Sequence, residues 1–147
     1  MGGSGTREAV RVASPEALSL ADVARQYAEH GRAEEARVLL DGLIVLEPEV
    51  AYLHTALGCV LMQLKKDDEA LERFAAALSL DPRDAAAHTY AGELRLSRGE
   101  VQVAAAHLDA AISLDPEGKD PYANRARMLR RAHESKEAPP AGGAARG

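Results

Sequence analysis

The chain has 147 residues, a formal net charge of −5 and a single cysteine, Cys59. This length fits one domain. The excess of acidic residues argues against general affinity for nucleic acid, whose phosphates attract a basic surface. One cysteine cannot form a disulfide within the chain. Because the sequence has no run of about 18 apolar residues and its first residues lack the apolar core of a secretory signal, we expect no membrane span and a cytoplasmic location.

Residues 1–13 predict a flexible lead-in before the first helix. Ser14 can cap the free amides at a helix start and Pro15 suits the first helical position, so we expect the first helix to begin here. From Ser14 to about Glu134, apolar residues recur at helical spacing and no alternating strand pattern occurs. Residues 135–147 are rich in Pro, Gly and Ala and predict a disordered tail.

Three short sequence motifs recur at a fixed spacing in the part of the chain between the lead-in and the tail. They are LIVLEP, ALSLDP and AISLDP, which end at Pro48, Pro82 and Pro116, each 34 residues after the one before. A period of this length indicates an array of repeated helix pairs, and such arrays are mostly binding surfaces. Aligning the chain on these prolines gives repeats at 17–50, 51–84 and 85–118, followed by a lone helix at 120–134. We expect that helix to cap the array by turning a polar face to water.

Small residues mark the turns and the contacts within each repeat. Gly31 and Gly99 occupy the same place in the first and third repeats, where one helix must stop and the backbone favours a positive φ. Lys65 stands at that place in the second repeat, so this turn must form without glycine. Gly58 and Gly92 lie inside the first helices of the second and third repeats, and they predict a close approach of the two helices of each pair.

The side chains that could carry chemistry do not combine into a catalytic or metal-binding pattern. Cys59 would need a nearby base, and His54, five residues earlier, lies on a different side of the predicted helix. His54 and His88 recur at the same place in successive repeats, but helices packed side by side lie about 8–10 Å apart, and two imidazoles isolated from each other in this way do not make a metal site. We therefore interpret both as packing residues. We therefore expect a protein that is not an enzyme and holds no metal or cofactor.

Four arginines gather on the last predicted helix, namely Arg125, Arg127, Arg130 and Arg131. A surface for nucleic acid would combine such residues with aromatic side chains on which bases stack, and this helix offers no such series. We expect instead a solvated cap face or an edge that pairs charges with a protein partner.

The repeats resemble the tetratricopeptide repeat family. The second repeat matches its pattern best, with Leu57-Gly58, Ala70 and Phe74 four residues apart, then Ala77 and Pro82. The resemblance implies an all-α fold over residues 14–134: a right-handed superhelical array of three helix-turn-helix repeats plus a C-terminal capping helix. In such an array the first helices of successive repeats line a concave surface that binds peptides.

The family's inward-facing positions transfer to all three repeats of this chain. They predict a peptide groove lined by Leu18, Ala21, Arg25 and Ala28 of the first repeat, Tyr52, Thr55, Cys59, Met62 and Gln63 of the second, and Ala86, Thr89, Glu93 and Leu96 of the third. Small Ala and Thr leave pockets between an adaptable Met62 and an amphipathic Tyr52, which suits an extended peptide with spaced apolar anchors.

A more specific resemblance is to the class II chaperones of type III secretion systems, carried by LLDGLIVLEP, LGCVLMQLKKDDEALERFAAALSLDP and HTYAGELRLSRGEVQVAAAHLDAAISL. It implies a cytosolic chaperone that holds a secreted client in the groove, and it leaves a homodimer as one alternative to a monomer. The competing hypothesis is a structural adaptor that joins folded partners in a larger bacterial assembly, such as a motility or envelope complex.

Overall fold

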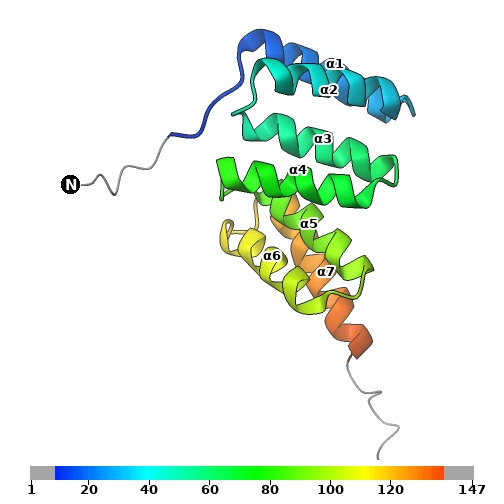
Figure 1. Cartoon of the computed structure of the whole chain (residues 1–147). Coiled ribbons are helices and arrows are strands. Elements are labelled where there is room, and N and C mark those ends of the chain that lie inside the picture. The colour runs from blue at the N-terminus through cyan, green and yellow to red at the C-terminus, as the bar shows by residue number, and fades with distance from the viewer. Residues whose placement is uncertain (1–8, 138–147) are drawn as a thin grey trace, which may run out of the picture.

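The chain folds as a stack of antiparallel helix pairs (Figure 1). The computed structural model describes residues 9–137, and within that span it holds no strand. The helices are α1 Pro15–Glu29, α2 Ala33–Leu46, α3 Ala51–Gln63, α4 Asp67–Leu80, α5 Ala85–Ser97, α6 Val101–Ser113 and α7 Pro121–Glu137. Each odd helix pairs with the even helix after it, and α7 packs on both α5 and α6. The predicted array of three helix pairs with a C-terminal helix is confirmed.

The two ends of the described chain differ from the expected boundaries in one respect. Helix α7 continues to Glu137, so residues 135–137 extend its solvated face, where His133 Nε2 lies 3.1 Å from Glu137 Oε1. The rest of the expected tail, 138–147, and residues 1–8 of the expected lead-in lie outside the described residues.

Ser14 caps α1 as the sequence predicted. Its Oγ accepts a hydrogen bond from the Ala17 amide at 3.1 Å. Its own amide and hydroxyl donate to the two carboxylate oxygens of Glu47 at 3.0 and 2.5 Å. These hydrogen bonds hold the pKa of the Glu47 carboxyl below its usual value. They also tie the start of α1 to the end of α2, and Ala13 just before the cap is buried.

The turn inside each repeat has one geometry in all three copies. Gly31, Lys65 and Gly99 have φ values of 78°, 61° and 76°. The residue after each donates its amide to a carbonyl five residues earlier, at 2.8, 2.9 and 3.0 Å. This is the bond that closes a helix end through a left-handed residue. The second repeat thus keeps the turn at the cost of placing a lysine in a backbone region that favours glycine.

The helices of a pair approach most closely at the glycines predicted to allow it. A Cβ added to Gly58 would lie 2.5 Å from Cε1 of Phe74, and one added to Gly92 would lie 2.7 Å from Cδ2 of Leu108. Phe74 and Leu108 are fully buried. Since no real Cβ contact is that short, each glycine is the space into which the facing helix inserts its largest apolar side chain.

Helix α7 is held on the last repeat by three of the four arginines named from the sequence. Arg125 makes two contacts with Glu93, at 2.6 and 3.1 Å. Arg130 Nε lies 3.0 Å from Asp109, and Arg127 contacts Asp115. These three arginines therefore pair charges within the chain and hold the cap in place.

The 34-residue period does not continue into α7. Asp84 caps α5 by accepting from the Ala87 amide at 2.9 Å, and Asp120 caps α7 by accepting from the Ala123 amide at 3.0 Å. Asp120 lies 36 residues after Asp84, because the loop before α7 contains two further residues and turns at Gly118, whose φ is 75°. This offset decides which α7 side chains face the inner side of the array.

Candidate binding groove

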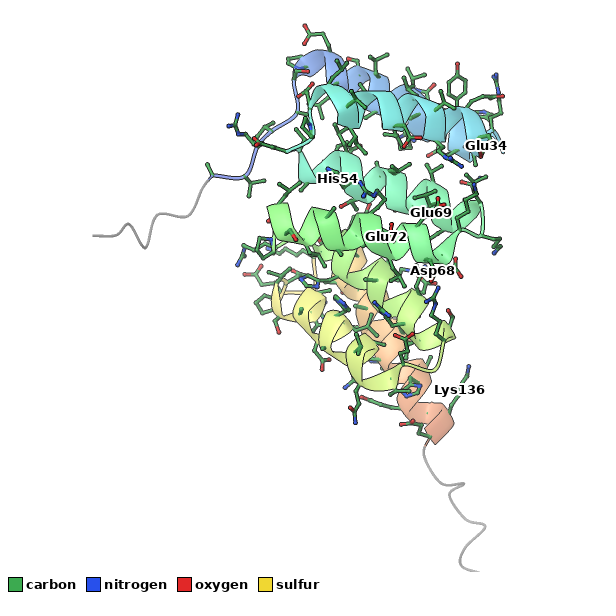
Figure 2. The ribbon with its side chains drawn as sticks, in the orientation of Figure 1. Glu34, His54, Asp68, Glu69, Glu72 and Lys136 are labelled. Atoms are coloured by element: carbon green, nitrogen blue, oxygen red, sulfur yellow. The ribbon has the colours of Figure 1, made fainter. Side chains whose placement is uncertain are left out.

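A cavity of about 680 Å³ runs along the inner side of the array. Its walls come from the first helices of the pairs, α1, α3 and the start of α5, together with the start of α7 and the chain just before α1. Figure 2 labels His54 of α3 and Glu69 and Glu72 of α4, none of which lines this cavity. A smaller hollow of about 290 Å³ between α2 and α4 includes both of these glutamates.

Most of the predicted groove residues line the larger cavity. They are Leu18, Ala21, Arg25, Ala28, Tyr52, Thr55, Cys59, Gln63 and Ala86. Tyr52 and Leu18 are 49% and 45% exposed, so both side chains can contact a guest. Others hold the walls together: Gln63 donates to the Ala28 carbonyl at 2.9 Å, which joins α3 to α1, and Thr55 donates to Asp84 at 2.6 Å, which joins α3 to α5.

Four predicted residues do not line this cavity. Met62 packs against the core. Thr89 is completely buried and donates to the Tyr122 carbonyl at 3.0 Å. Glu93 pairs with Arg125, and Leu96 packs with the cluster that includes Leu108. The last three share one cause, because α7 lies over the inner side of α5 and covers the positions that the third repeat would otherwise present.

Tyr122 and the segment 10–13 line the cavity although the sequence analysis did not place them there. Tyr122 is 40% exposed. It stands two residues after Asp120, which caps α7, just as Ala86 stands two residues after Asp84, which caps α5. Alignment on these helix caps, in place of the prolines, would have identified it. Val10 and Val12 are 48% and 83% exposed, and their position depends on the fold, since an irregular segment has no periodicity to interpret.

Aromatic rings connect the floor of the cavity to the core. Phe74 and Tyr90 stack with centroids 6.0 Å apart, and Tyr90 meets Tyr122 edge-on at 5.9 Å. Burial raises the pKa of both tyrosines, so their hydroxyls remain protonated. Burial also raises the pKa of the Cys59 thiol to about 12. A thiol of this kind contributes apolar surface, because only the thiolate is a nucleophile.

The cavity is lined by charges of both signs, namely Arg11, Arg25 and Arg83 with Asp81, Asp84 and Asp120. Arg25 is bound by Asp22 and Glu29 of its own helix, at 2.6 and 2.5 Å. Arg11 lies 3.4 Å from Glu49. The charges of the lining therefore select neither an acidic nor a basic guest.

The histidines His54 and His88, which do not line the cavity, repeat one contact. Nε2 of His54 lies 2.8 Å from the Pro48 carbonyl, and Nε2 of His88 lies 3.0 Å from the Pro82 carbonyl. Both rings therefore brace the loop before their helix. His88 additionally faces His107 of α6, with their Nδ1 atoms 3.1 Å apart. Within residues 9–137, no three or more side chains of metal-binding type come together, and no described helix is long and apolar enough to cross a bilayer.

We expect the stability of the protein to fall as the pH drops below about 6.5, the ordinary pKa of histidine. Burial, His88 and Arg95 lower the pKa of His107, so the unfolded chain binds the proton more readily than the folded one. The contribution is complete above the unfolded pKa of about 6.5 and is lost below it. Thermal melts at a series of pH values should show this slope, and His107→Gln should flatten it. An equal slope in both proteins would assign the effect to other groups.

Residues 55–124 match the family model described as tetratricopeptide repeat. A search of curated protein sequences gives no match. Among solved structures, the chain is similar to the Yersinia enterocolitica type III secretion translocator chaperone SycD in an alternative dimer, with 23% identity, a TM-score of 0.74 and coverage of 86% of this chain and 98% of that one.

Two further structures carry bound peptides. PcrH in complex with the chaperone binding region of PopD is 20% identical, with a TM-score of 0.74 and coverage of 88% of this chain and 100% of that one. The first repeat domain of Spaghetti (RPAP3), bound to the HSP90 peptide SRMEEVD, is 22% identical, with a TM-score of 0.71 and coverage of 83% and 98%. Residues 55–124 thus match the tetratricopeptide repeat model, and the described helical array has the same fold as these solved structures.

Proposed function

We propose that this chain binds an extended segment of a client protein along its inner cavity and acts, without enzymatic activity, as a cytoplasmic chaperone for a secreted client. The observation that carries the proposal is the cavity of about 680 Å³ with half-exposed Leu18, Tyr52 and Tyr122 on its walls. Such side chains expose apolar area to water, and a guest that covers them gains the hydrophobic contribution of that area.

The exposed side chains in the cavity narrow the class of client. Leu18, Tyr52 and Tyr122 favour a segment with spaced apolar side chains, whereas the lining charges, three arginines and three aspartates, favour neither sign. The similarity in fold to SycD and PcrH supports a secreted client. An acidic peptide such as the one bound by Spaghetti suits this chain less well, since the net charge of the whole chain is also negative. The dimeric SycD structure supports a homodimer for this chain as well.

The test is affinity capture of the client with a double variant, Tyr52→Ala with Tyr122→Ala. Truncating a central aromatic anchor commonly costs about 2 kcal/mol, which corresponds to roughly thirty-fold weaker binding. We expect the double variant to lose the captured client while its helicity stays unchanged, because both rings are 40% or more exposed.

The matched control is Val38→Ala with Val45→Ala, two side chains of α2 that are 69% and 80% exposed and lie off the cavity. This variant should capture the client as the wild type does. If the valine variant loses the client and the tyrosine variant keeps it, the protein binds through another face, and the structural adaptor becomes the better reading.

A further inference from the structure

The pair of histidines between α5 and α6 has the geometry of a chelate. The two Nδ1 atoms are 3.1 Å apart, the ring centroids are 5.4 Å apart, and the ring planes are inclined by 46°. Both side chains are half-buried, so each keeps some contact with solvent. This site is separate from the inner cavity, whose lining contains neither histidine.

The surroundings of His88 determine which of its ring nitrogens accepts. Its Nε2 lies 3.0 Å from the Pro82 carbonyl, and a carbonyl only accepts, so Nε2 carries the proton in the neutral ring. Nδ1 of His88 then accepts a hydrogen bond from Nδ1 of His107, at 3.1 Å. A metal ion would take the place of the shared proton once His107 is in its other neutral tautomer, with the proton on Nε2. Histidines that bind metals commonly hold their second nitrogen in this way, because the bond fixes both the tautomer and the ring orientation.

The second repeat shows which side chain can face the histidine in place of a second imidazole. His54 makes the same carbonyl contact, and its Nδ1 lies 3.0 Å from Nη1 of Arg73. A cationic donor therefore faces the histidine there. His107 stands 34 residues after Arg73 and brings a second ring nitrogen in place of the guanidinium. Because the third repeat has His107 in place of this arginine, a cation that faces His88 there would be a bound ion and not a side chain.

We propose that His88 and His107 form a two-histidine binding site for a divalent transition-metal ion of the Zn²⁺ class. With metal–nitrogen bonds of about 2.0–2.1 Å, a separation of 3.1 Å corresponds to an angle of roughly 100° at the metal, close to tetrahedral. Water completes the coordination on the solvent side. Imidazole nitrogen suits Zn²⁺, Cu²⁺ and Ni²⁺, and it does not suit Ca²⁺ or Mg²⁺.

The positive charge of Arg95 acts on His107 and opposes a bound cation there. The pairing of Arg95 Nη1 with Glu100, at 2.6 Å, offsets part of that repulsion. Since the two ligands come from different helices, the ion would join α5 to α6 and raise the melting temperature.

The test is a calorimetric titration of the full chain with ZnCl₂, paired with thermal melts. The key variant is His107→Arg, which reproduces the arrangement of His54 with Arg73 and should keep the fold. We expect wild type to bind one equivalent and to melt at a higher temperature with zinc. The His107→Arg variant should bind at least about tenfold more weakly and show no rise in its melting temperature.

Two further variants keep the outcome unambiguous. His133→Gln tests whether zinc binds elsewhere, because His133 lies beside the carboxylate of Glu137 and the two could hold a metal ion together. This variant should bind zinc as wild type does. His88→Gln should lose binding even if His107→Arg is poorly folded in metal-free melts. Equal zinc affinity in wild type and His88→Gln, or no saturable binding by wild type below about 1 mM, would overturn the proposal.

Discussion

Gly58→Leu is expected to lower the free energy of unfolding by about 3 kcal/mol. A Cβ alone would lie 2.5 Å from Cε1 of Phe74, and a leucine adds three more carbons in the same direction. Since Phe74 is fully buried, it has no open space into which to move, and the pair α3–α4 must separate. For a domain of this size the melting temperature should drop by roughly 10 °C.

Gly42→Leu is the matched control, because Gly42 also lies inside a helix but has nothing within 4 Å of an added Cβ. It should be neutral or slightly stabilising, since leucine favours helix over glycine by up to about 1 kcal/mol. The chain offers a rescue as well. Gly58→Ala with Phe74→Leu recreates the buried Ala24 and Leu40 of the first repeat. That double variant should melt above Gly58→Ala alone; indistinguishable melts for all these proteins would contradict the assigned packing.

Removing α7 is expected to cause association or unfolding of the remaining chain. A chain that ends at Lys119 loses the partners of Leu96 and Leu108 and the cover over Thr89. The lost burial of Leu129, Ala123 and Ala126 alone is on the order of 3 kcal/mol. Light scattering after size-exclusion chromatography, together with thermal melts, measures both effects. A chain that ends at Glu137 keeps every described helix and serves as the control.

A point variant gives the same test without truncation. Ala126 is completely buried against the last repeat, whereas Ala132 lies on the exposed side of α7. Ala126→Arg should therefore detach the cap and reproduce the effect of truncation, while Ala132→Arg should be silent. If Ala126→Arg melts and elutes as wild type does, α7 does not stabilise the third repeat in the way described.

The local features of this protein were predictable because neighbouring residues encode them. The 34-residue period separates the helix pairs, Ser14 caps the first helix, and Gly31 and Gly99 close turns that need a positive φ. Lys65 shows that the period predicts a turn even where its preferred residue is replaced. Gly58 similarly marked a close contact, since a glycine inside an amphipathic helix favours one.

The extent of the groove depended on contacts that no local pattern contains. Local patterns were enough to predict three helix pairs, a last helix and the inner face of α1 and α3. Packing between distant helices was needed to show that α7, displaced by two residues from the period, covers Thr89 and Glu93 and brings Tyr122 to the cavity. It likewise decided that His107 meets His88. The physical reason is that helix caps and periodicity act within about one turn, whereas loop length and packing set how one helix lies on another.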